Sequence, residues 1–272
     1  AIRCDPLASE RAIRCDPLAR SEYAITADTP VVIAHILPDL LNLYGDGGNV
    51  RVLEQRLAWR GIPVEVKRVH YGQAIDLDAV DLVVLGGSPD KEQRLASEEL
   101  RKIRDDLARY VDEDGPMLAI CGSYQMLGRV WLLDGEEVPG LGILDIETRR
   151  PGTSTDRLIS DIALETPFSD MPVIGFENHA GRTYLDEGVQ PFGRVVSEVG
   201  VGNNEDGSPE QYADGVLFKG VIGTYLHGPL LSKNPAVADH LLKLALERKA
   251  GREGDAPVEL SPLDDAEELA AN

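Results

Sequence analysis

The stretch GPMLAICGSYQMLG, residues 115–128, decides the fold. An apolar run from Met117 to Ile120 is long enough for a buried strand, and it ends at Cys121. The small residues Gly122 and Ser123 follow, and the residues after them are typical of the first turns of a helix. A strand that turns sharply into a helix places the thiol of Cys121 at the carboxyl edge of a sheet, where it can act as a nucleophile. The alternative is a buried core cysteine, which is the commoner state of a lone cysteine.

The segments around this stretch alternate between buried strands and amphipathic helices. Strands are expected at Val31–Leu37, Val64–Val69 and Leu82–Leu85. Apolar residues recur at helical spacing in two places, at Val50, Leu53 and Leu57, and at Leu100, Ile103, Leu107 and Val111. The second pattern predicts a helix of about 16 residues with Ser97 near its start. This alternation predicts an α/β fold, a three-layer doubly wound sheet that is mostly parallel and has helices on both faces.

Beyond Gly140 the pattern changes to short, half-alternating strands, which predict antiparallel additions to the sheet. They are expected at Ile143–Thr148, Val173–Glu177, Arg194–Val199 and Val216–Phe218. A further buried strand, Gly220–Leu226, ends at His227. Asn234 and Pro235 then begin a last amphipathic helix. Residues 31–250 are therefore predicted to form one domain.

The two ends of the chain are predicted to lie outside this domain. Residues 1–30 contain the octapeptide AIRCDPLA twice, at 1–8 and 12–19, and are interpreted as an N-terminal extension or an expression-vector remnant. Residues 251–272 are predicted to form an acidic, mobile tail, in which residues 264–271 could form a short helix on a partner.

Composition argues against several classes of protein. The formal charge of −20 argues against nucleic acid and against an anionic membrane surface as partners. No apolar run approaches the roughly 18 residues that cross a bilayer, so no membrane insertion is expected. Three cysteines cannot make a disulfide framework, which favours a reducing cytosol and a cytoplasmic location. No histidine cluster has metal-ligand spacing, so no metal is expected in this chain.

A cysteine, a histidine and a pair of glycines follow the carboxyl ends of three predicted strands. Cys121 and His227 each follow a buried strand, and the Gly86-Gly87 turn follows another. The carboxyl ends of parallel strands meet at one edge of a sheet, where ligands bind. An imidazole there can take the thiol proton and return it to a leaving amine. The backbone N–H groups of Gly87 and Gly122 could bind a tetrahedral oxyanion. Their shared location favours a nucleophilic cysteine over a core cysteine.

Five motifs carry a resemblance to a known family. They are PDLLNLYGDGGN (38–49), LGGSPDKEQ (85–93), CGSYQMLG (121–128), FENHAGRT (176–183) and TYLHGP (224–229). Together they resemble the class I (Cys-type) glutamine amidotransferases of the cobyric-acid-synthase-like branch, and within it the glutaminase subunits of lipid II isoglutaminyl synthases. The resemblance implies a flavodoxin-like fold. It also implies that Cys121 attacks the side-chain amide of glutamine, with His227 as base and then acid.

The same resemblance implies a substrate site and a partner. Gln125 and Arg157 would hold glutamine, since the fork of an arginine binds a carboxylate bidentately. Ammonia would pass to a Mur-ligase-like synthetase subunit in a heterodimer or larger assembly. With ATP and magnesium, that partner would amidate the α-carboxyl of D-glutamate in lipid II to D-isoglutamine, a step of peptidoglycan biosynthesis. No cofactor is expected in this chain.

One departure from the family concerns the group that orients His227. Many class I members carry an acid two residues after the histidine, but here Gly228 and Pro229 follow His227. We expect a backbone carbonyl or an acid of the partner to orient the imidazole. Asp46 is interpreted as part of a turn, and His179 as a residue that shapes the site.

Three other functions stay open at this point. The chain could be a glutaminase for another ATP-dependent synthase, such as a corrinoid amidase, although a synthetase domain would normally be fused to it in that case. It could be a catalytically idle amidotransferase-like scaffold, against which the intact Cys121, His227 and glycine turns argue. It could also be a cysteine hydrolase unrelated to glutamine.

Overall fold

A six-stranded sheet runs through the centre of the protein, in a computed structural model that describes residues 29–133, 136–150, 157–256 and 259–270. Its strand order is β13-β14-β4-β3-β1-β2. These strands are β1 (Val31–Ile36), β2 (Val64–Val69), β3 (Leu82–Leu85), β4 (Met117–Ile120), β13 (Val216–Phe218) and β14 (Val221–Thr224). They pair in parallel except for β13, which is antiparallel to β14 at the edge. The apolar runs of β1, β3, β4 and β14 are buried, as strands covered on both faces require.

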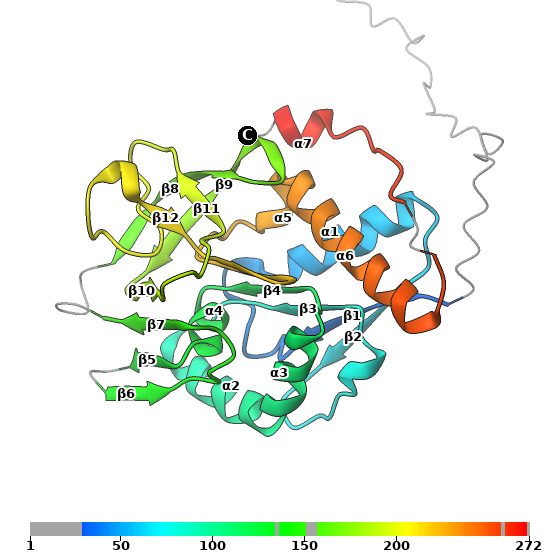
Figure 1. The fold of residues 1–272 in the computed structure, drawn as a ribbon, viewed down its shortest axis with the longest axis horizontal. Helices are drawn as coiled ribbons and strands as arrows, with labels where there is room; N and C mark the ends of the chain where they lie inside the picture. Colours follow the sequence, from blue (N-terminus) through cyan, green and yellow to red (C-terminus); the bar gives the residue numbers. More distant parts are fainter. Residues whose placement is uncertain (1–28, 134–135, 151–156, 257–258, 271–272) are drawn as a thin grey trace, which may run out of the picture.

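Helices cover both faces of this sheet (Figure 1). On one face α1 (Gly47–Trp59) packs against α6 (Pro235–Glu253), and both contact β1. On the other face lie α2 (Asp90–Lys102) and α3 (Arg104–Asp112). The arrangement confirms the predicted three-layer α/β fold with a mostly parallel sheet.

The apolar stripe from Leu100 to Val111 belongs to two helices, where the sequence predicted one of about 16 residues. The chain leaves helical geometry at Ile103, with φ −112° and ψ 15°, between α2 and α3. α2 also begins earlier than expected, at Asp90, directly after the Gly86-Gly87 turn. Asp90 and Glu92 in its first turn favour a helix start, because acids are stabilising at that end.

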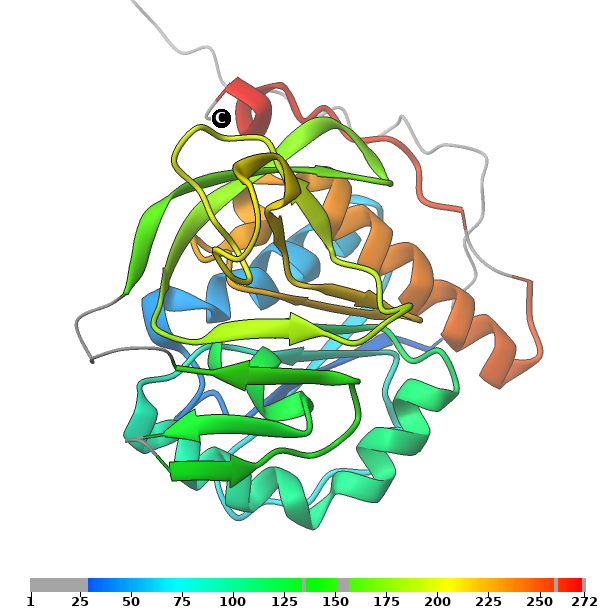
Figure 2. The same ribbon diagram turned by 60° about the vertical axis from the view of Figure 1, so that its left-hand side comes forward.

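Of the antiparallel additions predicted after Gly140, Val216–Phe218 joins the central sheet as β13. The strands between Val130 and Asp214 instead form two further sheets, which corrects the prediction for them. The sheets have the strand orders β10-β7-β5-β6 and β12-β11-β8-β9. Their members are β5 (Val130–Leu133), β6 (Glu136–Pro139), β7 (Ile146–Arg149), β8 (Leu158–Thr166), β9 (Ser169–His179), β10 (Arg182–Leu185), β11 (Gly193–Val195) and β12 (Ala213–Asp214). Both sheets lie at the end of the central sheet where α4 (Gly122–Leu127) follows β4 (Figures 1 and 2).

The acidic C-terminal segment packs on its own chain, whereas a mobile tail was expected. The helix α6 continues to Glu253, so the predicted boundary at 250 divides a helix. Further along, Asp265 forms an ion pair of 2.6 Å with the buried Arg56 of α1. α7 (Ala266–Ala270) contacts α5 (Leu230–Lys233). The repeated octapeptide at the other end lies outside the described residues.

Candidate active site

Cys121 occupies a strained turn between β4 and α4. Its φ of 52° and ψ of −107° lie in a region that residues other than glycine rarely adopt. The N–H of Cys121 donates to the carbonyl of Thr224 at 2.8 Å, and its own carbonyl accepts from the N–H of Gln125 at 3.0 Å. The residue is 7% exposed. A fixed, strained strand-to-helix turn of this kind is the geometry of a nucleophile elbow.

His227 reaches the same edge of the sheet from the segment after β14. Its N–H donates to the carbonyl of Phe176 in β9 at 2.9 Å, and its side chain is wholly buried. β14 lies directly beside β4, with Thr224 opposite Ile120. The two predicted catalytic residues therefore start from the ends of adjacent strands.

The side chains of Cys121, His227 and Asp46 converge on Gly87. A Cβ atom added to Gly87 would lie 3.0 Å from Cε1 of His227, and 3.3 Å from both Cβ of Cys121 and Oδ2 of Asp46. Any side chain at this position would meet all three groups, so glycine is required for their approach. The structure thus brings Cys121 and His227 together and adds an acid.

Asp46 faces the imidazole of His227, and both side chains are wholly buried. Oδ1 of Asp46 lies 3.7 Å from Nδ1 of His227, a distance at which the charges attract without a hydrogen bond. We expected a backbone carbonyl or a partner's acid to orient His227, and took Asp46 for a turn residue. The structure instead places an acid of this chain there, because strand β1, which precedes the loop of Asp46, lies next to β3.

The charge of His227 follows from these neighbours. Burial lowers the pKa of His227, but the Asp46 carboxylate and the Cys121 thiolate outweigh it and raise the pKa to about 9. The imidazole of His227, beside Cys121, is thereby favoured in its protonated form at neutral pH. The pair supplies both a nucleophile for a carbonyl carbon and a proton for a leaving nitrogen.

The two glycines predicted to bind an oxyanion differ in what their N–H groups do. The N–H of Gly87 donates to Oδ2 of Asp46 at 2.7 Å. This donor therefore already has an acceptor within the protein, whereas the sequence predicted that it would be available to an oxyanion. Gly122 is the first residue of α4, where an N–H has no acceptor within the helix. A Cβ on Gly122 would lie 3.1 Å from Oγ of Ser88, a buried hydroxyl without a hydrogen-bond partner among the described residues.

Gln125 is held by buried polar side chains one helical turn after Cys121. Its Nε2 donates to the hydroxyl of Tyr225 at 3.0 Å, and its Oε1 accepts from Nε2 of Gln93 at 3.0 Å. The ring of Tyr225 stacks on the ring of His179 with 3.6 Å between centroids. Both ends of the Gln125 amide are engaged in this way, and its contact with glutamine stays a prediction.

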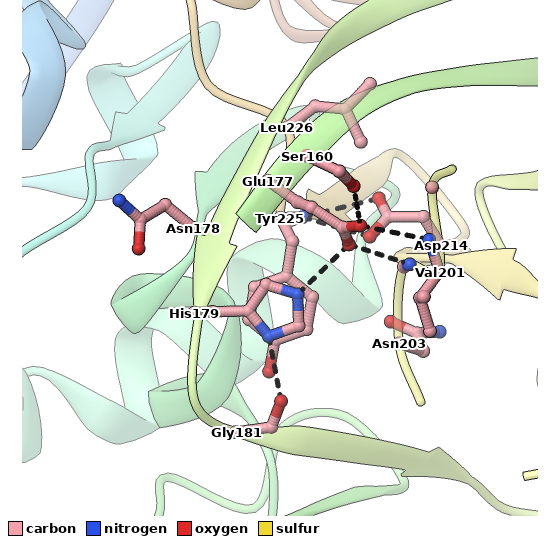
Figure 3. A network of polar contacts seen from close by, with 12 residues as sticks. Ser160, Glu177, Asn178, His179, Gly181, Val201, Asn203, Asp214, Tyr225 and Leu226 are labelled. Atoms are coloured by element: carbon pink, nitrogen blue, oxygen red, sulfur yellow. Dashed lines mark hydrogen bonds and ion pairs between the residues drawn. The ribbon is translucent and has the colours of Figure 1, made fainter. Parts of the chain in front are cut away.

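A buried polar network fixes His179 behind this tyrosine (Figure 3). Nε2 of His179 lies 3.4 Å from Oε2 of Glu177, and this oxygen also accepts from the N–H of Gly202. The other carboxylate oxygen, Oε1, accepts from the hydroxyl of Ser160 and the N–H of Val201. Burial raises the pKa of Glu177, but the hydrogen bonds from His179 and Ser160 bring it below its ordinary value. His179 thereby supports the ring of Tyr225, whose hydroxyl accepts the hydrogen bond from Gln125.

Arg157 lies outside the buried network, at the start of β8. Its Nε and Nη2 donate to Oδ1 of Asn178 at 3.0 and 2.8 Å. Nδ2 of Asn178 donates to the hydroxyl of Tyr44 at 2.6 Å. The ring of Tyr44 packs edge-on against the ring of His227, with 4.8 Å between centroids. Two side chains therefore connect Arg157 to His227, and its role in binding glutamine stays a prediction.

The described part of the chain shows neither a metal site nor a membrane-crossing helix. Among those residues, no three His, Cys, Asp or Glu side chains are grouped as a metal site requires. None of the helices there has both the length and the apolar character that crossing a membrane demands. The expectation that this chain holds no metal stays a prediction.

Comparisons with known proteins agree with this geometry. Residues 32–235 match the CobB/CobQ-like glutamine amidotransferase domain. The chain is 41% identical over 242 residues to the lipid II isoglutaminyl synthase (glutamine-hydrolyzing) subunit GatD of Staphylococcus aureus, a match that covers 89% of this chain and 93% of that protein. It is 36% identical over 227 residues to the subunit of the same name from Streptococcus pneumoniae, which covers 83% and 84% of the two chains.

More distant relatives share the domain or the fold. The cobyric acid synthase of Listeria innocua is 33% identical over 161 residues, which are 56% of this chain and 29% of that protein. A solved structure described as a glutamine amidotransferase superposes with a TM-score of 0.51 at 21% identity, covering 78% of this chain and 98% of that one, and shows a likeness of fold. Since the family match spans most of the folded chain, this chain belongs to the CobB/CobQ-like glutamine amidotransferase family.

Proposed function

We propose that this chain is the glutaminase subunit of a lipid II isoglutaminyl synthase. The observation that carries the proposal is the convergence of Cys121, His227 and Asp46 on Gly87. It occurs in a chain that matches the glutamine-hydrolyzing GatD subunit of Staphylococcus aureus over 89% of its own length. In this function the chain hydrolyses L-glutamine and supplies ammonia to a second subunit.

The reaction proceeds through a thioester. The thiolate of Cys121 attacks the side-chain amide carbon of glutamine, and the imidazolium of His227 donates its proton to the leaving nitrogen. Ammonia departs and a γ-glutamyl thioester remains on Cys121. Water, deprotonated by His227, then attacks this thioester and releases glutamate, which restores the thiolate and the imidazolium.

Backbone and side-chain groups around the pair have supporting roles. The N–H of Gly122 is our candidate to stabilise the tetrahedral oxyanion, because it has no acceptor within α4. The N–H of Gly87 can join it only if Asp46 turns away. Asp46 is a positioning residue, since it acts on the imidazole of His227 and not on glutamine.

The partner in this proposal is a Mur-ligase-like synthetase subunit. It would use ATP and magnesium to activate the α-carboxyl of D-glutamate in lipid II, and the ammonia would convert it to D-isoglutamine in the cytoplasm. The support is that the relatives from Staphylococcus aureus and Streptococcus pneumoniae are named as subunits of such a synthase. In a heterodimer or larger assembly, ammonia would pass from this chain to the synthetase subunit before water protonates it.

A nitrogen-source experiment tests this function. The chain is co-purified with its synthetase partner and given lipid II, ATP and magnesium, with either glutamine or ammonium chloride. The wild-type complex should amidate lipid II from both sources, and the Cys121→Ala complex only from ammonium chloride. The control Cys15→Ala should behave as wild type. Glutamine-dependent amidation that persists in Cys121→Ala would contradict the proposal.

A further inference from the structure

Tyr44 is held in an unfavourable backbone conformation beside the catalytic histidine. Its φ of 57° and ψ of 21° lie in the left-handed region, which a bulky residue adopts at an energetic cost. Its ring packs edge-on against His227 and Phe176, with 4.8 and 5.2 Å between centroids, yet Tyr44 remains 42% exposed. The fold thus directs a phenol toward the site and leaves part of it open to an incoming molecule.

The hydrogen bonds around Asn178 fix where the proton of this phenol can go. Arginine can only donate, so the atom of Asn178 that faces Arg157 must be the amide oxygen, Oδ1. The amide nitrogen must then donate to Tyr44, at 2.6 Å. Because the hydroxyl of Tyr44 accepts this bond, its own hydrogen is available for another acceptor.

Asn178 orients Arg157 without neutralising it. The guanidinium donates to Oδ1 and to the backbone carbonyl of Asn178, and neither oxygen carries a formal charge. The positive charge is therefore held in a defined place for an anion. One amide group, that of Asn178, separates the guanidinium from the hydroxyl of Tyr44.

The strand that carries Asn178 is anchored from its other side. Figure 3 shows Asn178 on the side of β9 opposite to Glu177 and His179. Those two residues belong to the buried network, with Glu177 wholly buried and His179 2% exposed. A fixed strand gives Asn178 a fixed position, so the two donors on either side of its amide are held in place before substrate arrives.

We propose that the hydroxyl of Tyr44 and the guanidinium of Arg157 together bind the α-carboxylate of glutamine, with Asn178 as the positioning residue between them. The inference rests on the proposed glutaminase function and adds Tyr44 and Asn178 to its substrate site. The ring of Tyr44 packs against His227, so this carboxylate site lies next to the histidine that converges with Cys121 on Gly87. The side-chain amide of the same glutamine would then extend toward Cys121.

Ligand protection of Cys121 tests the proposal on the full chain. Alkylation of Cys121 by iodoacetamide is followed by mass spectrometry of its peptide, and the Kd of each ligand is taken from the protection that it gives. The ligands are L-glutamine and 4-aminobutanamide, which has the same amine and amide but lacks the α-carboxylate.

Tyr44→Phe should raise the Kd of glutamine about tenfold, because a hydrogen bond to a charged group is lost. It should leave the Kd of 4-aminobutanamide within about twofold of wild type, because the ring remains. The matched control is Tyr71→Phe, at a tyrosine that is 49% exposed in the turn after β2. Equal effects of Tyr44→Phe on both ligands, or no effect on glutamine, would overturn the proposal.

Substitutions of Asn178 provide a second test, in which the conservative variant should weaken glutamine binding more than the alanine variant does. Asn178→Asp conserves shape but puts a carboxylate on Arg157, so it should weaken glutamine binding more than Asn178→Ala does. A residue that only supported the fold would show the reverse order. Absence of any protection of wild-type Cys121 by glutamine would overturn both this inference and the proposed function. Protection that Tyr44→Phe leaves unchanged would overturn the inference alone.

Discussion

Oδ1 of Asp46 lies 3.7 Å from Nδ1 of His227, while Oδ2 of the same carboxylate accepts the N–H of Gly87 at 2.7 Å. One buried acid therefore lies between the imidazole and the backbone that follows β3, and is hydrogen-bonded to that backbone. This relationship explains how the site can lack an acid two residues after the histidine, where Pro229 stands. The carboxylate that faces the imidazole comes from the loop before α1 instead.

Removal of this charge should slow glutamine hydrolysis. Asp46→Asn keeps the size of the side chain but loses the charge that favours the imidazolium, so kcat/KM for glutamine should fall about 100-fold. The assay is ammonia release by the complex with its synthetase. Asp39→Asn, at a more exposed acid earlier in the same loop, is the control and should leave kcat/KM unchanged.

The pH profile of the same variant separates an electrostatic effect from a loss of structure. The pKa of His227 is raised to about 9, so the wild-type rate should decline only as the pH approaches that value. In Asp46→Asn this basic limb should move toward neutral pH, because the carboxylate that raises the pKa is gone. A basic limb at the same pH in both proteins would contradict the role given to Asp46.

His227 should also make stability depend on pH. Its pKa in the folded protein is raised from 6.5 to about 9, so folding strengthens proton binding. The resulting contribution is fully present below pH 6.5 and is lost as the pH rises through about 9. The free energy of unfolding of wild type should therefore fall, relative to that of His227→Gln, by up to about 3 kcal/mol over this range. Urea denaturation at several pH values measures the difference, and parallel curves for the two proteins would speak against it.

Gly87 should tolerate no side chain. A Cβ there would lie 3.0 Å from Cε1 of His227 and 3.3 Å from Cβ of Cys121. Gly87→Ala should displace one of these groups and lower kcat by about 100-fold or more, since small misplacements of catalytic groups have effects of that size. Gly251→Ala is the control, because a Cβ at that position meets nothing within 4 Å. Wild-type turnover in Gly87→Ala would contradict the convergence described above.

The C-terminal segment should contribute to stability. Arg56, whose side chain is 2% exposed, is shared between Asp265 at 2.6 Å and Asp239 at 2.7 Å. Asp265→Asn should lower the free energy of unfolding by about 1–2 kcal/mol, because a bond to a buried charge is weakened. Glu267→Gln, at an exposed acid two residues on, should have no measurable effect in the same urea titration. Equal stabilities of the two variants would show that the segment is not held by this pair.

Local patterns predicted most of the fold and the approach of Cys121 and His227 to one another. The buried runs of β3 and β4 match their predicted bounds because strands covered on both faces are continuously apolar. The bounds of the edge strand β2 also match, although three of its residues are charged and only Val69 is buried. Cys121 and His227 were both expected at strand ends, and the parallel pairing of β4 with β14 brings those ends together. Alternating strands after Gly140 were recognised as strands, but alternation does not specify which sheet a strand joins.

Residues whose role depends on distant segments were missed. Asp46 lies in a glycine-rich loop that reads as a turn, and only the β4-β3-β1 order carries it to His227. For the same reason the sequence could not show that the N–H of Gly87 already has an acceptor. The composition of the acidic tail is typical of an unstructured segment. Its ion pair with Arg56 could not be predicted, because Arg56 lies far away in the sequence, in α1.

The central claim is that glutamine is hydrolysed through a thioester on Cys121, and rapid acid quenching tests it directly. The complex is mixed with glutamine, quenched at successive times and digested, and the peptide of Cys121 is weighed while ammonia is measured. We predict a γ-glutamyl adduct on Cys121 that forms together with the first equivalent of ammonia and disappears after glutamine is consumed. Full release of ammonia with an unmodified Cys121 peptide at every time would contradict the account.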